Sequence, residues 1–579
     1  MRKIILKFIL ISCLFNVNGQ NEIEIHGILN TEANSIIIKQ TINYYNNSDS
    51  SLSVLYFNDW SSSFSSPDSP LSERFVEEYN GALLNPKQKY RGFTSIHSVK
   101  NKQNDSLSYS YLENQCDLFK IKLDNILLPY KTTSVIIEYT IQIQSDRFTK
   151  YGVTNEKDYF LNYWHITPAV YTGTEWKLYS NKNLDDYYTP KSNIKLSIEV
   201  PTGYRVTSEL NTKNIINNLN TQVFTFEGKD RTDTRLNISR EPFFKFNIGD
   251  LNIISNSLST GEELVQQMNA FKKVVSFLSN KLGDYPHKNL MISRVDLKKN
   301  PIYGLNMLPG FLNPFSEEFE YELTIAKNLI KLYLDQYLKM NPRDDHWLKS
   351  GLETVLLIKY VDQHHKDQKM LGKLADFWGV RTYNLAKLKY NEQYNLAYMH
   401  TVRNGRDQAL SLPKDELLKF NVNLASKYKA AKGLIFLEDF IGDSRIEEWI
   451  KEFVVKNKNE FITTKDFETY INSKSVKDLS WFFKSFLTNT QQIDYKIKTL
   501  RSDQDSIYFN VKNIKSGETP ISLFTMKEGK ILTKSWLSAI GKDEDFVVTN
   551  NSADKLVLNY DQKVPEFNTK NNWKSVTGN

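Results

Sequence analysis

The chain has 579 residues, of which 40% are hydrophobic and 24% are charged. This balance excludes a disordered protein and predicts three or four globular domains. The formal net charge is +7, and three of the cations (Arg2, Lys3 and Lys7) lie in an acid-free stretch at the start, which leaves +4 for residues 21–579. A value so close to neutral gives no argument for a nucleic acid or an anionic membrane surface as the partner.

Residues 1–20 predict an export signal. A basic start precedes an apolar run that ends at Phe15, and the small residue Gly19 follows it. This is the layout of a secretory signal peptide, and the run is too short to span a membrane. We expect cleavage near Gly19 and export to the periplasm or cell envelope of a bacterium. An alternative is lipid anchoring through Cys13, which ends the loose lipidation box LISC.

After cleavage, Cys116 would be the single cysteine of the mature chain, so no disulfide is expected. Export without disulfides fits a large protein that its own hydrophobic core stabilises. As the lone thiol in a strand-rich stretch, Cys116 is expected to be a small buried apolar residue. No segment after residue 20 is apolar for long enough to form a transmembrane helix.

The pattern along the mature chain predicts a multidomain α+β protein. Segments such as SIIIKQTINYY and SVIIEYTIQI alternate apolar and polar residues between turn-rich clusters, which predicts one large antiparallel β domain over residues 21–249. The period then changes, and TGEELVQQMNAFKKVVSFLSNKLG has the early acids and final glycine of a helix. We expect a mixed α/β domain over 250–400, helices over 401–489 and a small β domain over 490–579.

A short segment, DHWLKSGLET, carries the main resemblance to a known family. It contains Trp347, Leu348, Gly351 and Thr354 in a W-L-x-x-G-x-x-T arrangement. Together with the order of the predicted domains, it resembles the zinc aminopeptidases of the membrane alanyl aminopeptidase type, which are gluzincin metallopeptidases. The resemblance implies a β-saddle N-terminal domain, a thermolysin-like catalytic-type domain, a helical region and a C-terminal β domain, with the boundaries given above.

The family signature is H-E-x-x-H, eighteen further residues and a Glu. The two histidines lie one helical turn apart and bind zinc, the first Glu polarises the attacking water, and the distal Glu closes the site. Counting back from Gly351 without a gap places Lys327 and Lys331 at the histidine positions. Asn328 occupies the position of the catalytic Glu in the signature, and Ser350 occupies the position of the distal Glu. All four positions are therefore substituted.

These substitutions predict a degenerate site without a metal or other cofactor. A charged lysine donates hydrogen bonds but has no lone pair for zinc. On its own, the polar stripe that contains Lys327, Asn328 and Lys331 is typical of a solvated helix face. With the resemblance, the same stripe is expected to face the interdomain cleft.

Two other segments resemble functional motifs of the family. In YGLNMLPGF, Gly304 and Pro309 match the loop that recognises the substrate's free amine, and Met307 stands where the family has Glu. In YKAAKGLIFLEDFIGD, Lys432 and Gly433 match. Ala430 replaces the tyrosine that stabilises the oxyanion, and Tyr428 lies two residues out of register. A metal could have moved to nearby acids and histidines, although such residues are more often caps or solvated groups: Asp344, Asp345, His346, Glu353, Asp362 and His365.

We predict an exported aminopeptidase-fold protein that is a non-catalytic pseudo-peptidase and binds a peptide or protein segment in the interdomain cleft. One mode would be strand addition along residues 304–309, with the two lysines attracting an anionic group. The alternatives are an active zinc aminopeptidase with an unconventional site, for which zinc would be the cofactor, and a structural or assembly component of the cell envelope. We expect no nucleic acid partner and no transmembrane segment in the mature chain. The candidate cleft residues are Gly304, Met307, Pro309, Lys327, Lys331 and Tyr428.

Overall fold

A computed structural model of the chain describes residues 19–442, 446–457 and 461–576. The predicted signal segment, apart from residues 19 and 20, and Cys13 within it lie outside the described residues. The chain divides into two compact units. Unit 1 comprises Met1–Phe75, Gly81–Asn181 and Tyr187–Arg240, and unit 2 comprises Val76–Asn80, Lys182–Asp186 and Glu241–Asn579. No helix within the described ranges is both long enough and apolar enough to cross a membrane.

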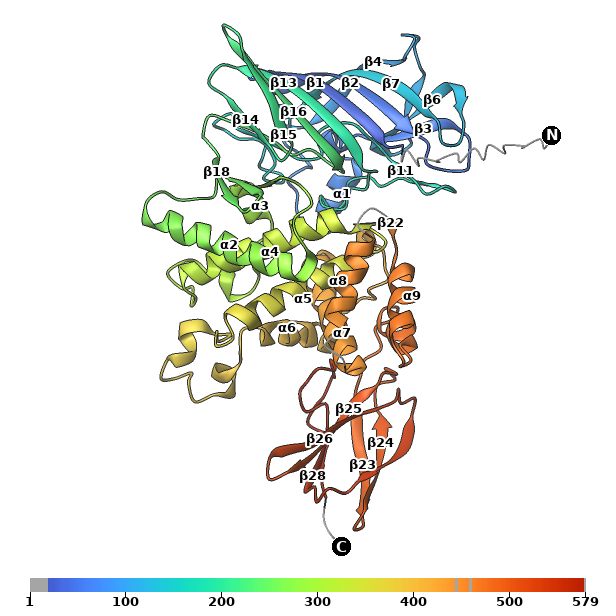
Figure 1. The fold of residues 1–579 in the computed structure, drawn as a ribbon, viewed down its shortest axis with the longest axis vertical. Coiled ribbons are helices and arrows are strands. Elements are labelled where there is room, and N and C mark those ends of the chain that lie inside the picture. The colour runs from blue at the N-terminus through green and yellow to red at the C-terminus, as the bar shows by residue number, and fades with distance from the viewer. Residues whose placement is uncertain (1–18, 443–445, 458–460, 577–579) are drawn as a thin grey trace, which may run out of the picture. The chain divides into compact units, whose positions relative to one another are not determined.

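Unit 1 is built on a seven-stranded sheet (Figure 1). Its strands, in spatial order, are β15 (Asn211–Asn217), β16 (Thr221–Arg231), β13 (Ser192–Pro201), β1 (Asn21–Asn30), β2 (Ser35–Tyr45), β7 (Thr132–Gln142) and β4 (Phe93–Asn101). Strand β1 shows why the sequence forms a sheet with one buried face: Ile23 and Ile25 are buried, whereas Glu22 and Glu24, which alternate with them, are exposed.

One pair in this sheet differs from the predicted antiparallel arrangement. Strand β1 pairs with β13 in parallel, whereas β13–β16, β15–β16, β1–β2, β2–β7 and β4–β7 are antiparallel. A parallel pair requires a long crossover connection. The chain between β1 and β13 supplies one, because all of β2 to β12 lies between them. The alternation of residues along a strand does not reveal the direction of its partner.

Smaller sheets complete unit 1. One has the order β10 (Thr167–Pro168), β3 (Leu52–Asn58), β6 (Gln115–Leu127) and β5 (Tyr109–Leu112), and another has β14 (Arg205–Ser208), β17 (Leu236–Ser239), β9 (Tyr159–Leu161) and β8 (Gly152–Val153). Strands β11 (Val170–Tyr171) and β12 (Trp176–Lys177) form a hairpin, and α1 (Pro70–Glu77) lies at the boundary of the units. One hydrophobic core joins the large sheet to the smaller ones.

Unit 2 begins with a small sheet and the helices that pack on it. The sheet has the order β18 (Phe244–Ile248), β19 (Leu251–Ser255) and β20 (Asn289–Ile292). The helices of this part are α2 (Glu262–Leu282), α3 (Arg294–Lys299), α4 (Glu317–Tyr337) and α5 (His346–His364). Helix α4 packs against both α2 and α5, so its buried face lies in the main core of the unit.

Further helices and a final β region complete unit 2. The helices are α6 (Glu392–Arg403), α7 (Ser426–Ile441), α8 (Ile446–Lys456) and α9 (Thr464–Lys474), and β21 (Lys339–Met340) pairs with β22 (Phe461–Ile462). Strands β23 (Tyr495–Ser502), β24 (Ser506–Asn513) and β27 (Asp543–Thr549) form one terminal sheet. Strands β26 (Lys530–Leu537), β25 (Ile521–Lys527), β28 (Lys555–Leu558) and β29 (Trp573–Ser575) form the other, and both follow the helices towards the C-terminus (Figure 1).

Helices α5 and α7 approach each other closely where α5 has a glycine. A Cβ atom placed on Gly351 would lie 3.0 Å from the Cβ of Ala430 and 3.0 Å from Cδ1 of Leu434. A larger side chain would therefore push the two helices apart. This contact fixes the register between α5, which carries Ser350, and α7, which carries Tyr428.

Candidate functional site

Helix α4 carries three of the four positions that, by the family resemblance, would correspond to zinc-site residues. It begins after Ser316, whose hydroxyl accepts a hydrogen bond from the Phe319 amide, and its first turn contains three glutamates, which interact favourably with the helix dipole. The side chains of Leu323, Ala326 and Ile330 are buried in the core. The polar face on the other side carries Lys327 and Lys331.

Lys327 is held in place by backbone and aromatic contacts rather than by a carboxylate. Its Nζ donates a hydrogen bond of 2.5 Å to the carbonyl oxygen of Pro301 and lies 5.1 Å from the centre of the Tyr303 ring. Burial lowers the pKa of Lys327 to about 7, and repulsion from Lys427 contributes to this shift. The face is therefore half-buried and not fully solvated.

The side chains at the other three positions either have partners within the protein or are poor metal ligands. The Asn328 amide is buried and donates a hydrogen bond of 2.9 Å to the Thr324 carbonyl oxygen of its own helix. Lys331 pairs with Asp335 at 2.7 Å. Ser350 is half-buried on α5, and its hydroxyl is a weak zinc ligand compared with a carboxylate.

These residues do not fit a zinc ion. Zinc sites in proteins use thiolate, imidazole and carboxylate ligands, whereas the four positions here offer two amines, an amide and a hydroxyl. The carboxylate nearest to Lys331 is Asp335, which also accepts a hydrogen bond from Lys349. In the part of the chain that the structure describes, no three His, Cys, Asp or Glu side chains are grouped so that they could hold a metal.

The structure brings further lysines to this face that the sequence did not reveal. We call the set the lysine cluster: Lys299 at the end of α3, Lys327 and Lys331 on α4, Lys349 on α5, Lys414 in the loop before α7, and Lys427 on α7. Four carboxylates lie among them, namely Asp185, Asp296, Asp335 and Glu353. Lys414 pairs with Asp185 at 2.5 Å. With every group ionised, six positive charges face four negative ones.

The pKa shifts show that these lysines are close enough to repel one another. Burial lowers the pKa of Lys349 to about 7, with a further contribution from Lys331. Burial also lowers the pKa of Lys299 to about 8 and that of Lys427. For Asp185, burial raises the pKa, but the ammonium groups of Lys414 and Lys331 outweigh it, so that the net shift is downward. The surrounding ammonium groups therefore stabilise the ionised form of a carboxylate placed among them.

Two members of the site have no direct partner. Within the described residues, the side chains of Lys427 and Glu353 form no hydrogen bond or ion pair, although the Glu353 carboxylate favours the charged form of Lys427. In the sequence, Lys349 and Lys427 are simply the residues next to Ser350 and Tyr428. Adjacent residues of a helix point in different directions, so this adjacency does not predict that the two lysines share a site. Their convergence depends on the packing of α5 against α7.

The segment that resembles the amine-recognition loop is not a strand. Residues 305–307 form a turn of 3-10 helix after Gly304, which has a φ of 100°, and the side chains of Met307 and Pro309 are exposed. The predicted strand addition along residues 304–309 is therefore wrong, since a 3-10 turn offers no ladder of hydrogen bonds to an incoming strand. The turn is anchored through Asn306, which donates to Glu320 on α4 at 3.1 Å.

Helix α7 uses the other predicted positions mainly for packing. Ala430 is fully buried against Gly351. Tyr428 is half-buried and makes an edge-on contact with Tyr394 on α6, with the ring centres 4.9 Å apart, and burial raises its pKa. The Lys432 ammonium group donates to the carbonyl oxygen of Gln562 at 3.2 Å and is thus directed to the C-terminal β region, away from the lysine cluster.

Five of the six residues considered for a relocated metal have other partners, and the sixth, Glu353, lies beside the lysine cluster. His346 is buried and contacts the Leu412 carbonyl oxygen at 3.0 Å, and burial lowers its pKa to about 4. Asp345 accepts hydrogen bonds from the backbone and the hydroxyl of Thr464, at 2.9 and 2.7 Å. His365 contacts Glu322 at 2.7 Å. Asp344 and Asp362 accept from asparagine side chains.

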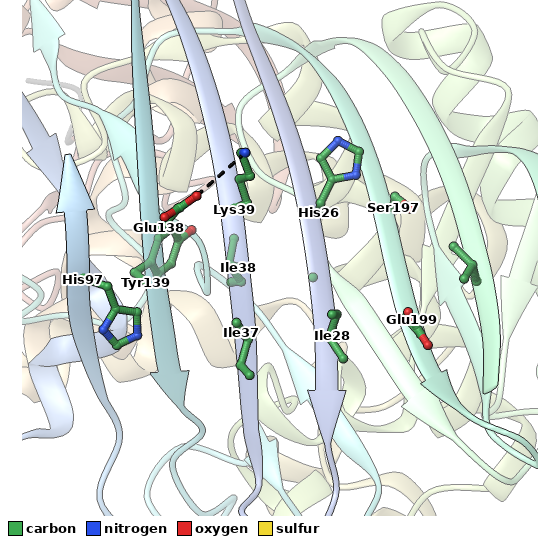
Figure 2. A pocket seen from close by; sticks show the side chains of 12 residues that line it. His26, Ile28, Ile37, Ile38, Lys39, His97, Glu138, Tyr139, Ser197 and Glu199 are labelled. Atoms are coloured by element: carbon green, nitrogen blue, oxygen red, sulfur yellow. Dashed lines mark ion pairs between the residues drawn. The ribbon is translucent and has the colours of Figure 1, made fainter. Parts of the chain in front are cut away.

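The lone thiol and a surface pocket of unit 1 offer no catalytic arrangement. Burial raises the pKa of Cys116 to about 12, so its thiol stays protonated at neutral pH. A pocket of about 440 Å³ lies on the outer face of the seven-stranded sheet. Figure 2 shows the side chains that line it, among them His26 on β1 and His97 on β4. Strands β2 and β7 lie between these histidines, which places them roughly 14 Å apart, too far to share a ligand. No predicted site residue lines this pocket.

Comparison with known proteins identifies the fold. No protein-family model and no curated protein matches the chain. Among solved structures, the crystal structure of Legionella pneumophila aminopeptidase A in complex with aspartic acid superposes with a TM-score of 0.64 at 13% sequence identity. The match covers 94% of this chain and 59% of that chain, so this chain spans less than two thirds of the neighbour. The likeness shows a multidomain, aminopeptidase-like fold with both strands and helices.

Proposed function

We propose that the chain is a non-hydrolytic protein of the aminopeptidase-like fold that binds an acidic peptide or protein segment through the lysine cluster. The observation that carries the proposal is that the positions expected to ligate zinc hold Lys327 and Lys331, which stand among four further lysines. A protonated amine cannot ligate zinc, but it donates hydrogen bonds to carboxylates and attracts them. The finer assignment to the membrane alanyl type and the setting in a bacterial periplasm or cell envelope belong to the same proposal.

The charge balance supports an anionic ligand. The six lysines outnumber the four carboxylates around them, and a bound carboxylate would relieve the repulsion among the charged amines. It would also favour the charged form of Lys327 and Lys349, whose pKa values are about 7. Binding would therefore take up protons and strengthen as the pH falls from 8.5 to 6.5. The Legionella neighbour was solved with aspartic acid, an amino acid with an acidic side chain.

Two measurements on the purified full chain separate this proposal from an active enzyme. Bound zinc is determined by elemental analysis, and turnover of fluorogenic aminoacyl substrates is measured with and without added Zn²⁺. We expect neither stoichiometric zinc nor turnover. Chelator-sensitive hydrolysis would establish the alternative of an active aminopeptidase with an unconventional site.

Binding is tested with a fluorescein-labelled hexapeptide of glutamate against the glutamine hexapeptide, by anisotropy at pH 6.5. We expect the glutamate peptide to bind more tightly, and the double variant Lys327→Gln/Lys331→Gln to weaken it about ten-fold or more. The matched control is Lys498→Gln, which removes a half-exposed lysine that pairs with Asp543 at 2.8 Å in the C-terminal β region. Equal effects of the double variant and the control would leave the cluster without a role and favour a structural function in the envelope.

A gain-of-function variant tests the gap-free alignment that places Lys327, Asn328, Lys331 and Ser350 at the zinc-site positions of the family. The quadruple substitution Lys327→His, Asn328→Glu, Lys331→His and Ser350→Glu restores the family's ligand set and makes the local charge more negative. Because positions 327 and 331 share a helix face that packs beside α5, we expect one zinc per chain. Absence of zinc in a folded quadruple variant would refute the gap-free register.

A further inference from the structure

The loop between α5 and α6 is closed at its base and fixed to the core. The backbone amide of Met370 donates to the Leu388 carbonyl oxygen at 2.9 Å, and the amide of Tyr390 donates to the Gln368 carbonyl oxygen at 2.8 Å. The amide of Lys373 donates to the carbonyl oxygen of Pro314, also at 2.9 Å. We call residues 370–388 the aromatic loop. Its ends are joined and it contains two 3-10 turns, Gly372–Asp376 and Asn384–Lys387, and Figure 1 shows it in yellow, projecting from the helices.

The aromatic loop is apolar on the outside. Its buried interior consists of small residues such as Ala375 and Ala386. The large side chains point to solvent, with exposed fractions of 55% for Phe377, 74% for Trp378 and 66% for Tyr383. Leu374, Leu385 and, just before the Pro314 anchor, Phe311 and Leu312 are also exposed. An outward cluster of this kind is costly in water and marks an interaction surface.

The same segment is strongly basic. Residues 366–389 contain six cations (Lys366, Lys369, Lys373, Arg381, Lys387 and Lys389) and two carboxylates (Asp367 and Asp376), a net charge of +4. Of the six cations, Lys369 pairs with Asp376 at 2.7 Å. The other five form no ion pair with any residue that the structure describes. The exposed aromatic rings thus lie in a segment with five cations that have no ion-pair partner among the described residues.

We infer that the aromatic loop docks the protein on an anionic lipid membrane surface. Tryptophan, tyrosine and phenylalanine side chains enter the boundary between headgroups and acyl chains, while lysines extend to the phosphates. The charge complements an anionic leaflet, where each cation near the surface strengthens binding about five-fold. The fixed base lets the rings insert together as one rigid element. This docking is peripheral, and it is independent of what the lysine cluster binds.

Two other occupants fit the loop less well. A second copy of the chain would bring two segments of net charge +4 together, which repel each other. A nucleic acid would stack on the rings, but it would leave Leu374, Leu385 and Leu312 exposed to water. A lipid surface satisfies both the aliphatic side chains and the cations.

The test uses the purified full chain and co-sedimentation with large vesicles in 150 mM NaCl. We expect binding to vesicles of phosphatidylcholine and phosphatidylglycerol in a 7:3 ratio, and much weaker binding to pure phosphatidylcholine. The triple variant Phe377→Ser/Trp378→Ser/Tyr383→Ser should lose about ten-fold or more in affinity. The triple variant Lys373→Gln/Arg381→Gln/Lys387→Gln should lose about a hundred-fold. All six side chains are exposed, so both variants are expected to fold, which a thermal melt checks.

The matched control removes exposed apolar side chains elsewhere, as Tyr79→Ser/Leu219→Ser/Val476→Ser, three residues that are more exposed than Trp378. Its vesicle binding should equal that of the wild type. The inference is overturned if the wild type does not sediment with anionic vesicles, or if the aromatic variant binds as well as this control. It is also overturned if the wild type is a dimer that the aromatic variant dissociates, or if that variant loses affinity for a 20-nucleotide RNA but not for vesicles.

Discussion

The electrostatics of the lysine cluster predict that Lys327 is partly neutral at physiological pH. With a pKa of about 7, half of its amine is unprotonated at pH 7, whereas an ordinary lysine with a pKa near 10.4 has about one neutral amine in 2,500. The neutral form is thus enriched about 1,000-fold. Since only the neutral amine reacts with acylating reagents, its labelling should level off above pH 8 instead of rising to pH 10.

Two neutral substitutions should move this titration in opposite directions. Repulsion from Lys427 lowers the pKa of Lys327, and attraction to Glu353 raises it. Lys427→Gln should therefore raise the midpoint, and Glu353→Gln should lower it. Both changes replace a half-buried side chain by an uncharged one of similar length, so a general loss of packing would not produce opposite shifts.

Competitive labelling with trace isotopic acetic anhydride, followed by mass spectrometry of the peptide that contains Lys327, measures the midpoint directly. Free N-acetyl-lysine amide in the same tube serves as the reference. The midpoint depends on protonation and not on access, because access scales the rate equally at every pH. A midpoint above about 9, or shifts of the same sign in the two variants, would refute the electrostatic interpretation of the cluster.

Two further predictions concern stability. Burial raises the pKa of Glu322, but hydrogen bonds from His365, Tyr360 and Lys273 outweigh it and bring it to about 2. Because the folded value lies below the ordinary one, this stability is present above pH 4.5 and lost as the pH falls towards 2. Glu322→Gln should cost about 3 kcal/mol at pH 7 and little near pH 2, measured by urea unfolding. Gly351→Val should cost about 1–3 kcal/mol by crowding α7, whereas Gly310→Ala, whose Cβ meets no atom within 4 Å, should be neutral. Equal costs for both glycines would contradict the helix contact.

The sequence predicted the features of the fold that depend on local pattern. Alternation along residues 35–45 gives a strand with buried Ile36 and Ile38, and the Thr/Gly start and early acids before residue 282 give helix α2. The count from Gly351 to Lys327 places both residues on the packed helices α5 and α4. Each of these predictions needs only the period of one element or the spacing between two neighbouring elements.

Features that depend on distant packing could not be predicted. The six lysines of the cluster come from four helices, α3, α4, α5 and α7, and from the loop before α7. Nothing in the spacing of Lys299 and Lys427 indicates that the two side chains lie in the same cluster. The hypothesis of strand addition along residues 304–309 required an extended segment there. The observed 3-10 turn instead depends on Asn306, which is anchored by Glu320 on α4 and contacts the Tyr390 hydroxyl at 2.8 Å.

The net charge of the whole chain does not reveal where positive charge is concentrated. Residues 21–579 carry a net charge of +4, and residues 366–389 alone also carry +4, so the rest of the mature chain is formally neutral. The average gave no reason to consider an anionic membrane, yet the whole excess lies in one segment whose aromatic side chains are exposed. Since electrostatic attraction to a surface decays within about 10 Å in physiological salt, it is this local excess, and not the average, that determines what the chain approaches.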